Sequence, residues 1–421
     1  MQKIESSSLK EAYKLVEHPS GLKVYLYKKS GYKSCHAVFG TKYGSVDVTF
    51  SRDGKNYITV TDGIAHFLEH KLFESEELDA FELFAKTGAY ANAYTSFDRT
   101  CYLFGCSNNL EENLKILLNF VQSPYFTKET VEKEQGIIGQ EIKMYLDSPD
   151  WRVLFNLLGA LYHVNPVKID IAGSVESISK IDDKLLYECY NTFYNPQNMF
   201  LVVVGDFDED KIYSLIDEGI KKPYKKVEIL REIPSEPDSI VTSYTEQKLE
   251  VAKPLFMLGY KLKPDGVYSG VKFKTAVEIL LEILVGKFSP LRTKLIEKGL
   301  VNDNFEFEFF DTRNTATVIF SGESDNPQAV KSEILAEVDY LRKCGLSESS
   351  FIAATKKAFG EHVAAFDRVE GIASMLVECA VTGTTLFEHI DAIENLKIED
   401  VKQVLTALDS NKAALSVITG R

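Results

Sequence analysis

Two histidines and a glutamate lie close together near residue 66, where their spacing suits metal chemistry. His66 and His70 are four residues apart, and Glu69 directly precedes His70. On a helix, residues four apart share one face, so both imidazoles can reach one tetrahedral zinc ion through bonds of ~2.0–2.1 Å. Glu69 borders the same face and can take a proton from an attacking water. The spacing therefore predicts a zinc site with an adjacent general base.

The pattern H-x-x-E-H is rare by chance. With 7 His in 421 residues, a chain of this composition should contain it roughly 0.01 times. The alternative is an ordinary helix whose two histidines are satisfied by capping or core hydrogen bonds. The concentration of two histidines within five residues favours the metal site.

A catalytic zinc usually has three protein ligands and one open position, so a third ligand is needed. Glu134 and Glu141 are seven residues apart, which on a helix is two turns along one face. Glu141 lies among Ile137, Ile138, Ile142 and Met144, so we expect a largely buried turn, where a carboxylate needs a cationic partner. A solvated acidic helix is the alternative, because such pairs of glutamates are common.

The elements that must position these side chains recur in the same order in both halves of the chain. The first half shows a helical pattern over residues 63–73 and strand patterns at Leu22–Tyr27, His36–Phe39, Ala89–Thr95, Cys101–Cys106 and Met199–Val204. The second half shows a helical pattern at Val271–Val285 and strand patterns at Val251–Tyr260, Phe305–Phe310, Thr315–Phe320 and Ala413–Ile418.

Local matches at nearly constant offsets indicate a duplication. The offsets are 215, 211 and 213 for the pairs Phe73/Phe288, Gly88/Gly299 and Asn198/Asn411. Three similar offsets in one order are hard to obtain from unrelated halves. We expect an N-terminal zinc-bearing domain over 1–220, a proline-containing linker over 221–238 and a related C-terminal domain without a metal site over 239–421. Hairpins with clustered helices predict an α+β fold, each domain being a largely antiparallel sheet covered by helices.

Composition and charge exclude several classes of function. Lys and Arg total 48 against 62 Asp and Glu, a net charge of −14, which repels phosphate backbones and anionic lipid. We therefore expect no nucleic-acid partner and no membrane association. Six scattered cysteines without a C-x-x-C pair predict neither a disulfide framework nor a thiolate zinc site. With no signal-peptide pattern at the N-terminus, we expect a cytoplasmic protein.

H-x-x-E-H is the signature of the inverzincins, and its surroundings carry a more specific resemblance. The chain resembles the pitrilysin/insulinase family of zinc metallopeptidases, in the short-subunit type that includes mitochondrial processing peptidase and bacterial homologues. The resemblance covers the whole chain, strongly over 35–210 and more weakly after 250. Besides the histidine motif, it rests on the stretches Gly88–Ser96, Glu134–Glu141, Tyr194–Met199 and Val203–Phe207.

The resemblance implies a role for each residue of the site. One Zn²⁺ per chain would be held by His66, His70 and Glu141, with Glu69 as general base and Glu134 supporting the ligands. The strand Ala89–Thr95 would pair with the backbone of a peptide substrate. Asn92 and Ala93 match the substrate-contacting positions of the family; a turn-capping amide is the alternative for Asn92.

The second half departs from the family pattern in a way that bears on partners. Leu281, Leu284 and Val285 stand where the zinc residues would be, so we expect one site per chain. The Arg/Tyr pair that active relatives present from this half is missing, because Lys298–Asn302 reads Lys-Gly-Leu-Val-Asn. We therefore expect a homologous partner subunit that supplies the pair, in a heterodimer; a homodimer is the alternative.

The expected function is that of a zinc-dependent endopeptidase cleaving peptides or unfolded segments, active only when paired with a homologous subunit. The alternative is a non-catalytic or narrowly dedicated subunit for peptide maturation or assembly. An intact H-x-x-E-H motif argues against a non-catalytic role, because such subunits usually lose these residues.

Overall fold

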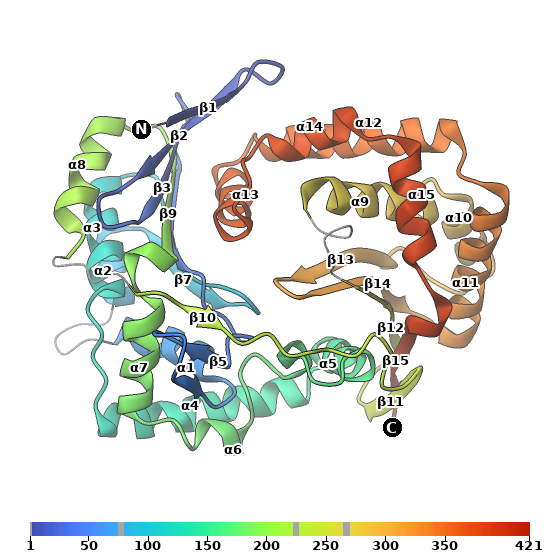
Figure 1. Ribbon diagram of the computed structural model, residues 1–421, viewed down its shortest axis with the longest axis horizontal. Coiled ribbons are helices and arrows are strands. Elements are labelled where there is room, and N and C mark those ends of the chain that lie inside the picture. Colours follow the sequence, from blue (N-terminus) through green and yellow to red (C-terminus); the bar gives the residue numbers. More distant parts are fainter. Residues whose placement is uncertain (1, 75–79, 222–226, 264–269) are drawn as a thin grey trace. The chain divides into compact units, whose positions relative to one another are not determined.

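The computed structural model describes residues 2–74, 80–221, 227–263 and 270–421, which form two compact units (Figure 1). Unit 1 comprises Met1–Ile142, Asp170–Glu232 and Val363–Phe387, and unit 2 comprises Lys143–Ile169, Ile233–His362 and Glu388–Arg421. Each unit thus draws on both halves of the sequence. Residues 222–226 of the expected linker lie outside the described residues, and the domain boundaries expected from the sequence stay a prediction.

Unit 1 is built on a seven-stranded sheet in the order β1-β2-β3-β9-β4-β8-β7. Its strands are β1 (Gln2–Ser6), β2 (Glu11–Glu17), β3 (Lys23–Lys28), β4 (Cys35–Thr41), β7 (Tyr90–Thr95), β8 (Thr100–Cys106) and β9 (Met199–Gly205). Strands β3 and β9 are parallel, and the other neighbours pair antiparallel in the described part of the chain. A small sheet contains β5 (Thr49–Ser51), β6 (Tyr57–Thr59) and β10 (Leu230–Arg231).

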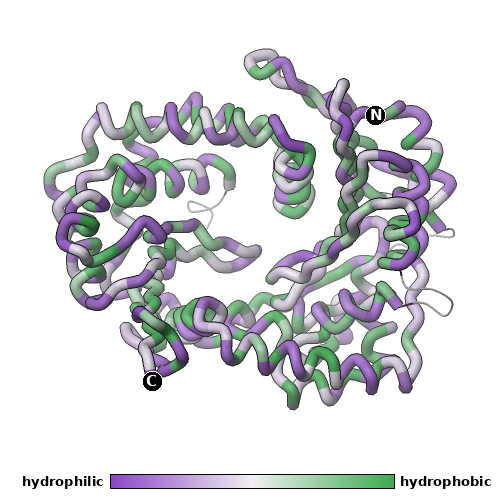
Figure 2. The backbone as a smooth tube through the Cα atoms, turned by 180° about the vertical axis from the view of Figure 1, so that it is seen from behind, coloured by the Kyte–Doolittle hydropathy of each residue, from purple (hydrophilic) through white to green (hydrophobic). Residues whose placement is uncertain are grey.

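The helices of unit 1 come mainly from the first half of the chain. They are α1 (Ile64–Phe73), α2 (Ala80–Thr87), α3 (Leu110–Val121), most of α4 (Lys128–Leu146), α6 (Val175–Ile178), α7 (Asp183–Phe193), α8 (Glu209–Gly219) and α13 (Val369–Thr382). Hydrophobic and hydrophilic residues alternate within the helical turns (Figure 2), so most helices can bury one side against a sheet.

Strand β9 is buried along its whole length, because both faces of the sheet are covered. One face, which includes Phe200, Val202 and Val204, packs against α13. Helix α3 packs on β4 and β8. The continuous apolar run of β9 is the pattern expected for a strand covered on both sides.

Unit 2 is built on a five-stranded sheet in the order β11-β15-β12-β14-β13, in which β11 and β15 are parallel. Its strands are β11 (Tyr244–Leu249), β12 (Leu255–Leu262), β13 (Glu306–Thr312), β14 (Thr315–Glu323) and β15 (Ala413–Gly420). Its helices are α5 (Pro149–Leu161), α9 (Val271–Val285), α10 (Pro290–Glu297), α11 (Pro327–Cys344), α12 (Glu348–Ala365, of which 363–365 fall in unit 1), α14 (Glu388–Asn395) and α15 (Ile398–Ala407).

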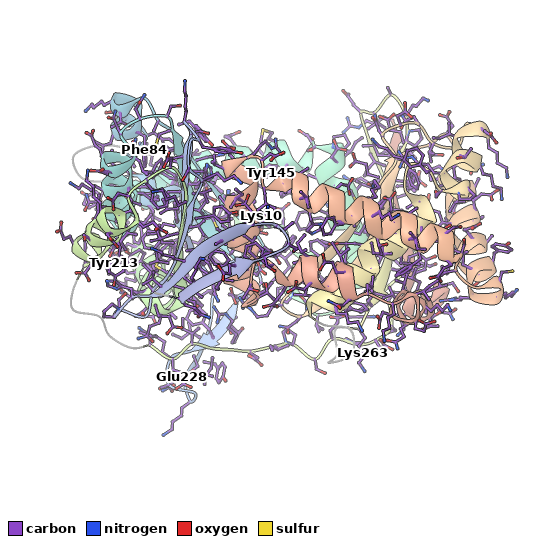
Figure 3. All side chains as sticks on the ribbon, turned by 90° about the horizontal axis from the view of Figure 1, so that it is seen from above. Lys10, Phe84, Tyr145, Tyr213, Glu228 and Lys263 are labelled. Carbon is purple, nitrogen blue, oxygen red and sulfur yellow. The ribbon has the colours of Figure 1, made fainter. Side chains whose placement is uncertain are left out.

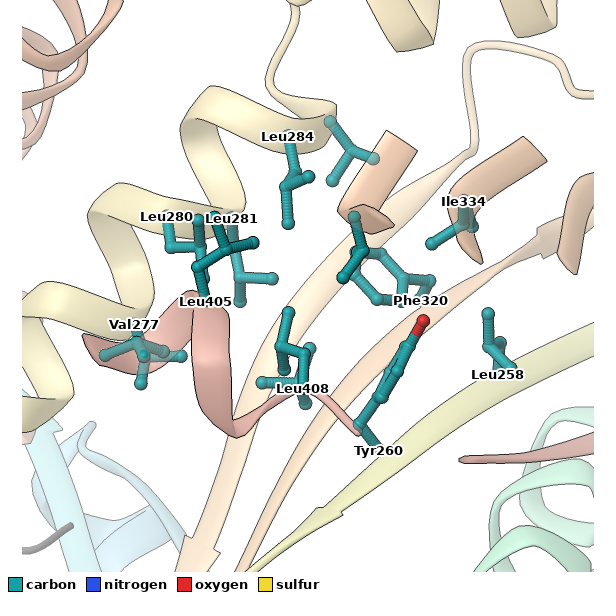
Figure 4. Packing of buried hydrophobic residues seen from close by; sticks show 14 of the residues in the cluster. Leu258, Tyr260, Val277, Leu280, Leu281, Leu284, Phe320, Ile334, Leu405 and Leu408 are labelled. Atoms are coloured by element: carbon teal, nitrogen blue, oxygen red, sulfur yellow. The ribbon is translucent and has the colours of Figure 1, made fainter. Parts of the chain in front are cut away.

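Helix α9 forms much of the core of unit 2 on one face of this sheet. Its buried residues Leu280, Leu281 and Leu284 share a cluster with Tyr260 and Phe320 of the sheet (Figure 4). On β12, a Cβ at Gly259 would lie 2.9 Å from side-chain atoms of α5. Helix α5, from the first half of the chain, therefore packs closely on the sheet of unit 2.

The α+β class and the largely antiparallel sheets expected from the sequence are confirmed. Helix α9 has the expected bounds, and each expected strand of the first half coincides with an observed strand to within two residues. The β1–β2 hairpin was missed, because its strands are mostly polar and partly exposed. Its turn contains Lys10 (Figure 3), which has a φ of 56°. In the described part of the chain, every helix is too short or too polar to cross a membrane.

The start of α1 is fixed by close backbone packing. Gly63 precedes the helix with a φ of 89°, a conformation that favours glycine. A Cβ at this position would lie 2.4 Å from the carbonyl oxygen of Ala172. The neighbouring Asp62 carbonyl accepts a 2.8 Å hydrogen bond from the Ser177 hydroxyl. These contacts determine where the helix carrying the histidine motif begins.

We predict that Gly63→Ala lowers the free energy of unfolding by about 1–3 kcal/mol, because it combines backbone strain with a collision. The control is Gly136→Ala in α4, where a Cβ would meet open space and the substitution should stabilise by about 0.4–1 kcal/mol. Urea denaturation of both variants measures the effect. Equal stability of Gly63→Ala and the parent would contradict this account of α1.

Candidate metal centre

Helices α1 and α4 bring the predicted ligands together within unit 1. His66 and Glu69 are buried, and His70 lies one turn after His66 and is half-buried. From α4, Glu134 and Glu141 contact this face of α1. The expectation of a largely buried turn around Glu141 is wrong, because Ile137 and Met144 are exposed and Glu141 is only half-buried. His66, His70 and Glu141 offer ligand atoms that all lie within 4.8 Å of one another.

The spacing of these atoms suits a shared cation better than direct hydrogen bonds. The Nε2 atoms of His66 and His70 lie 3.7 and 3.4 Å from the two carboxylate oxygens of Glu141. Two ligands of a tetrahedral zinc with bonds of 2.0–2.1 Å would be about 3.3–3.4 Å apart. Two imidazole nitrogens and one carboxylate are also a common ligand set of catalytic zinc. Both the chemistry and the spacing of the group therefore fit zinc.

Glu134 orients one of the imidazoles. The Nδ1–H of His70 donates a hydrogen bond of 3.0 Å to Oε1 of Glu134. The Nε2 lone pair is then left to face Glu141, which is the arrangement that second-shell carboxylates impose on metal-binding histidines. Glu134 is itself buried, so its ionised form depends on such a partner.

Burial and the local charges move the pKa values of these groups in different directions. Burial, together with the neighbouring His70, lowers the pKa of His66 to about 3, so its imidazole is neutral and able to bind a metal. Burial opposes protonation of His70, but the hydrogen bond to Glu134 and the charges of the three nearby glutamates raise its pKa overall. Burial also opposes ionisation of Glu134, yet His70 holds its pKa below the usual value.

Glu69 is held by the neighbouring edge strand. The hydroxyl of Thr95, at the end of β7, donates a hydrogen bond of 2.8 Å to Oε2 of Glu69. Burial raises the pKa of Glu69, and the Thr95 hydroxyl and His70 limit that rise. A carboxylate whose pKa is raised toward neutrality is suited to accept and return a proton.

A cavity of about 380 Å³ opens beside the group within unit 1. Its lining includes Glu69, His70, Glu134, Asn92 and Ala93, so the two predicted substrate contacts border the same space as the predicted base. In the described part of the chain, β7 is an edge strand that pairs only with β8. The exposed Asn92 accepts a 2.9 Å hydrogen bond from the backbone N–H of Ala93, and because both residues lie within β7 this contact does not cap a turn.

Sequence reasoning overlooked some neighbours of Glu69. Thr95 was noted only as part of a matching stretch, although its place at the end of the strand after α1 was a usable signal. Tyr102 and Tyr194 are buried and are joined by a 2.8 Å hydrogen bond between their hydroxyls. Burial, together with the charge of Glu69, raises the pKa of both tyrosines. They come from β8 and from the residue after α7, and nothing in their spacing indicated that they meet.

The stretch expected to lack an Arg/Tyr pair lies at the end of α10 in unit 2. Lys298 forms an ion pair with Glu333 of α11. Asn302 donates a hydrogen bond of 2.8 Å to Glu323 of β14. Both side chains are thus engaged within unit 2.

Comparison with known proteins adds a family to this geometry. The family model described as "Insulinase (Peptidase family M16)" matches residues 58–175, and the model "Peptidase M16 inactive domain" matches residues 180–357. The first match contains the histidine motif and also Glu134 and Glu141 of α4. The second covers β12, α9 and the β13–β14 hairpin.

Individual relatives span nearly the whole chain. The chain is 42% identical over 409 residues to the uncharacterized zinc protease YmfH of Bacillus subtilis (strain 168), covering 96% of this chain and 95% of the relative. A crystal structure from Alicyclobacillus acidocaldarius, described as M16-like, superposes with a TM-score of 0.94 at 34% identity, covering 99% of this chain and 100% of that one. A chain of complex III2 from Candida albicans shares the fold, with a TM-score of 0.75 at 15% identity and coverage of 96% and 95%. Because the chain is 42% identical to a zinc protease over nearly its full length and has a His/His/Glu group in the matched region, it belongs to peptidase family M16, the insulinase and pitrilysin family.

Proposed function

We propose that this protein is a zinc-dependent endopeptidase that cleaves peptides or unfolded segments at the group on α1 and α4. The observation that carries the proposal is the convergence of His66, His70 and Glu141, with ligand atoms within 4.8 Å at separations suited to one zinc ion. Glu69 lies on the same face of α1 and is buried beside them. Family membership supports the same reading.

In this proposal, each side chain of the group has one task. His66, His70 and Glu141 hold the zinc ion, which when bound supplies a Lewis acid for peptide hydrolysis. Glu69 takes a proton from the attacking water and then returns it to the leaving amine. Glu134 keeps His70 in the tautomer that binds metal, and Thr95 keeps the carboxylate of Glu69 in place.

We further propose that an extended substrate pairs with the edge strand β7. Main-chain hydrogen bonds to a strand edge provide affinity without a fixed sequence, which suits peptides and unfolded segments. Asn92 and Ala93 would then contact the substrate, because both line the cavity beside Glu69 and His70. A folded protein offers few free extended strands, so its backbone would be excluded.

A homologous partner subunit that supplies an Arg/Tyr pair completes the proposal. In the family resemblance, the stretch from Lys298 to Asn302 takes the place of the segment that carries this pair, but it contains neither Arg nor Tyr. The side chains of Lys298 and Asn302 both bind partners within unit 2. The rival function is a dedicated subunit for peptide maturation or assembly, and the fold shared with a chain of complex III2 is in keeping with it. The complete H-x-x-E-H motif favours the peptidase.

We predict that the purified protein holds one zinc ion at this group and that Glu141→Gln weakens its retention, because a neutral amide is a poorer ligand for a dication. Metal analysis after dialysis against a weak chelator measures the loss. The matched control is Glu132→Gln, on an exposed turn of the same helix, which should keep its zinc. Full retention by Glu141→Gln would move the third ligand elsewhere, with Glu134 the first position to test.

Glu69→Gln is expected to keep zinc but to lose peptide cleavage, since the substitution removes the base and leaves both imidazoles in place. Cleavage of an unstructured fluorogenic peptide and the zinc content are measured on the same preparation. Glu112→Gln, at an exposed position of α3, serves as the control with parental activity. Parental cleavage by Glu69→Gln would show that the assigned mechanism is wrong.

Pairing with a homologue that bears Arg and Tyr should raise turnover by about 10²–10³, the usual effect of one positioned electrophilic donor. The assay compares hydrolysis of an unstructured peptide by this chain alone and after addition of the homologue. Adding the homologue with its Tyr changed to Phe separates the donor from mere association. Full activity of the isolated chain, without gain from a partner, would defeat the pairing proposal and leave the zinc assignment standing.

A further inference from the structure

A second group of metal-binding side chains lies in unit 2. Glu278 of α9, His362 of α12 and His389 of α14 each offer a ligand atom, and these atoms all lie within 4.8 Å of one another. All three residues are half-buried and belong to unit 2, whereas the ligands proposed for catalysis belong to unit 1. The three come from separate helices.

One histidine of this group is already held in the form that binds a metal. The Nδ1 atom of His362 lies 3.0 Å from the carbonyl oxygen of Ala358. A carbonyl can only accept, so Nδ1 carries the hydrogen and the Nε2 lone pair of the neutral ring is left available. This is the same kind of orientation that Glu134 imposes on His70.

Contacts beside the group fix the three helices relative to one another. The rings of His362 and His389 stack with their centroids 5.7 Å apart and their planes 25° apart, which joins α12 to α14. About one turn before His362 on α12, Lys357 forms a 2.6 Å ion pair with Glu282 of α9. The ligand positions are therefore preorganised by contacts in which a metal has no part.

The charges around Glu278 favour a dication. Lys274, Asp311 and Glu361 act on its carboxylate, together with His362. Lys274 is paired with Asp311 at 2.6 Å, and Lys357, besides its contact with Glu282, lies 3.2 Å from Glu361. Apart from Glu278 itself, these residues carry three carboxylates and two ammonium groups, so the net charge around the ligand is negative.

We propose that Glu278, His362 and His389 form a second site for a divalent transition-metal ion, with zinc as the first candidate, that cross-links α9, α12 and α14. Two imidazole nitrogens and one carboxylate oxygen suit zinc and similar ions, whereas Mg²⁺ and Ca²⁺ prefer oxygen ligands alone. The sequence predicted one ion per chain, because Leu281, Leu284 and Val285 stand where zinc residues would be in the second half. The ligands proposed here lie 84 and 27 residues apart, and only the fold brings them together.

The test uses the full chain, stripped of metal and titrated with zinc, with bound zinc measured by equilibrium dialysis. We expect two zinc ions per parental chain and one for His389→Gln or Glu278→Gln, whose affinity at this site should fall by more than about 100-fold, since even outer-shell partners contribute about 10- to 100-fold. The matched control is His163→Gln, a half-buried histidine of unit 2 outside the group, which should bind two.

The variant His70→Gln distinguishes this site from the proposed catalytic site. His70→Gln alone should keep one zinc ion, and the double variant His70→Gln/His389→Gln should keep none. Thermal unfolding gives a second measurement, because zinc that binds the folded state raises the melting temperature; this rise should persist in His70→Gln and disappear in the double variant. Saturation of the parent at one zinc, or two zinc ions in both His389→Gln and Glu278→Gln, would overturn the second site without touching the proposed peptidase. If the control His163→Gln also lost the second zinc ion, binding of that ion would be non-specific, and this result would overturn the proposal as well.

Discussion

Burial of β9 on both faces is the constraint on which the rest of unit 1 depends. Its residues from Phe200 to Val204 are fully buried, and leaving either face in water would forfeit roughly 25 cal/mol for each Å² of apolar surface. The strand is held between β3 and β4 and is covered by α13 on one side. Strand β4 in turn pairs with β8, and β8 pairs with the edge strand β7, against which α1 packs. The positions of the histidines and of Glu69 follow from this order of strands.

Much of this architecture was predictable from local patterns, and the failures have physical causes. Strand β9 and helix α9 were predicted because a run of apolar residues, or an apolar helical face, records burial directly. The β1–β2 hairpin was not, because polar, half-exposed strands leave little periodic signal and its turn residue Lys10 has an unusual φ of 56°. The periodicity of apolar residues also shows that a helix such as α13 buries one face. It does not show against which sheet that face packs.

The candidate site divides in the same way. The spacing of His66 and His70 predicted their convergence, because neighbours on one helix need no tertiary information. Glu141 needed a family resemblance, and the contact of Thr95 with Glu69 needed the fold. The second group is the extreme case, since His362 and two further ligands come from three helices. Four of the seven histidines thus belong to two groups of metal-binding side chains. The group on α1 and α4 can be predicted from the sequence, whereas the group in unit 2 cannot.

The two halves of the chain exchange a helix: α5, from the first half, packs on the sheet of unit 2, and α13, from the second half, packs on the sheet of unit 1. During synthesis from the N-terminus, the strands of the seven-stranded sheet of unit 1 are all made by residue 205, yet one face of that sheet stays uncovered until residues 369–382 emerge. About two fifths of the chain must therefore be translated before this apolar sheet face can be covered by its helix. Neither half of the chain covers its own sheet completely, so the two halves need to be made as one polypeptide.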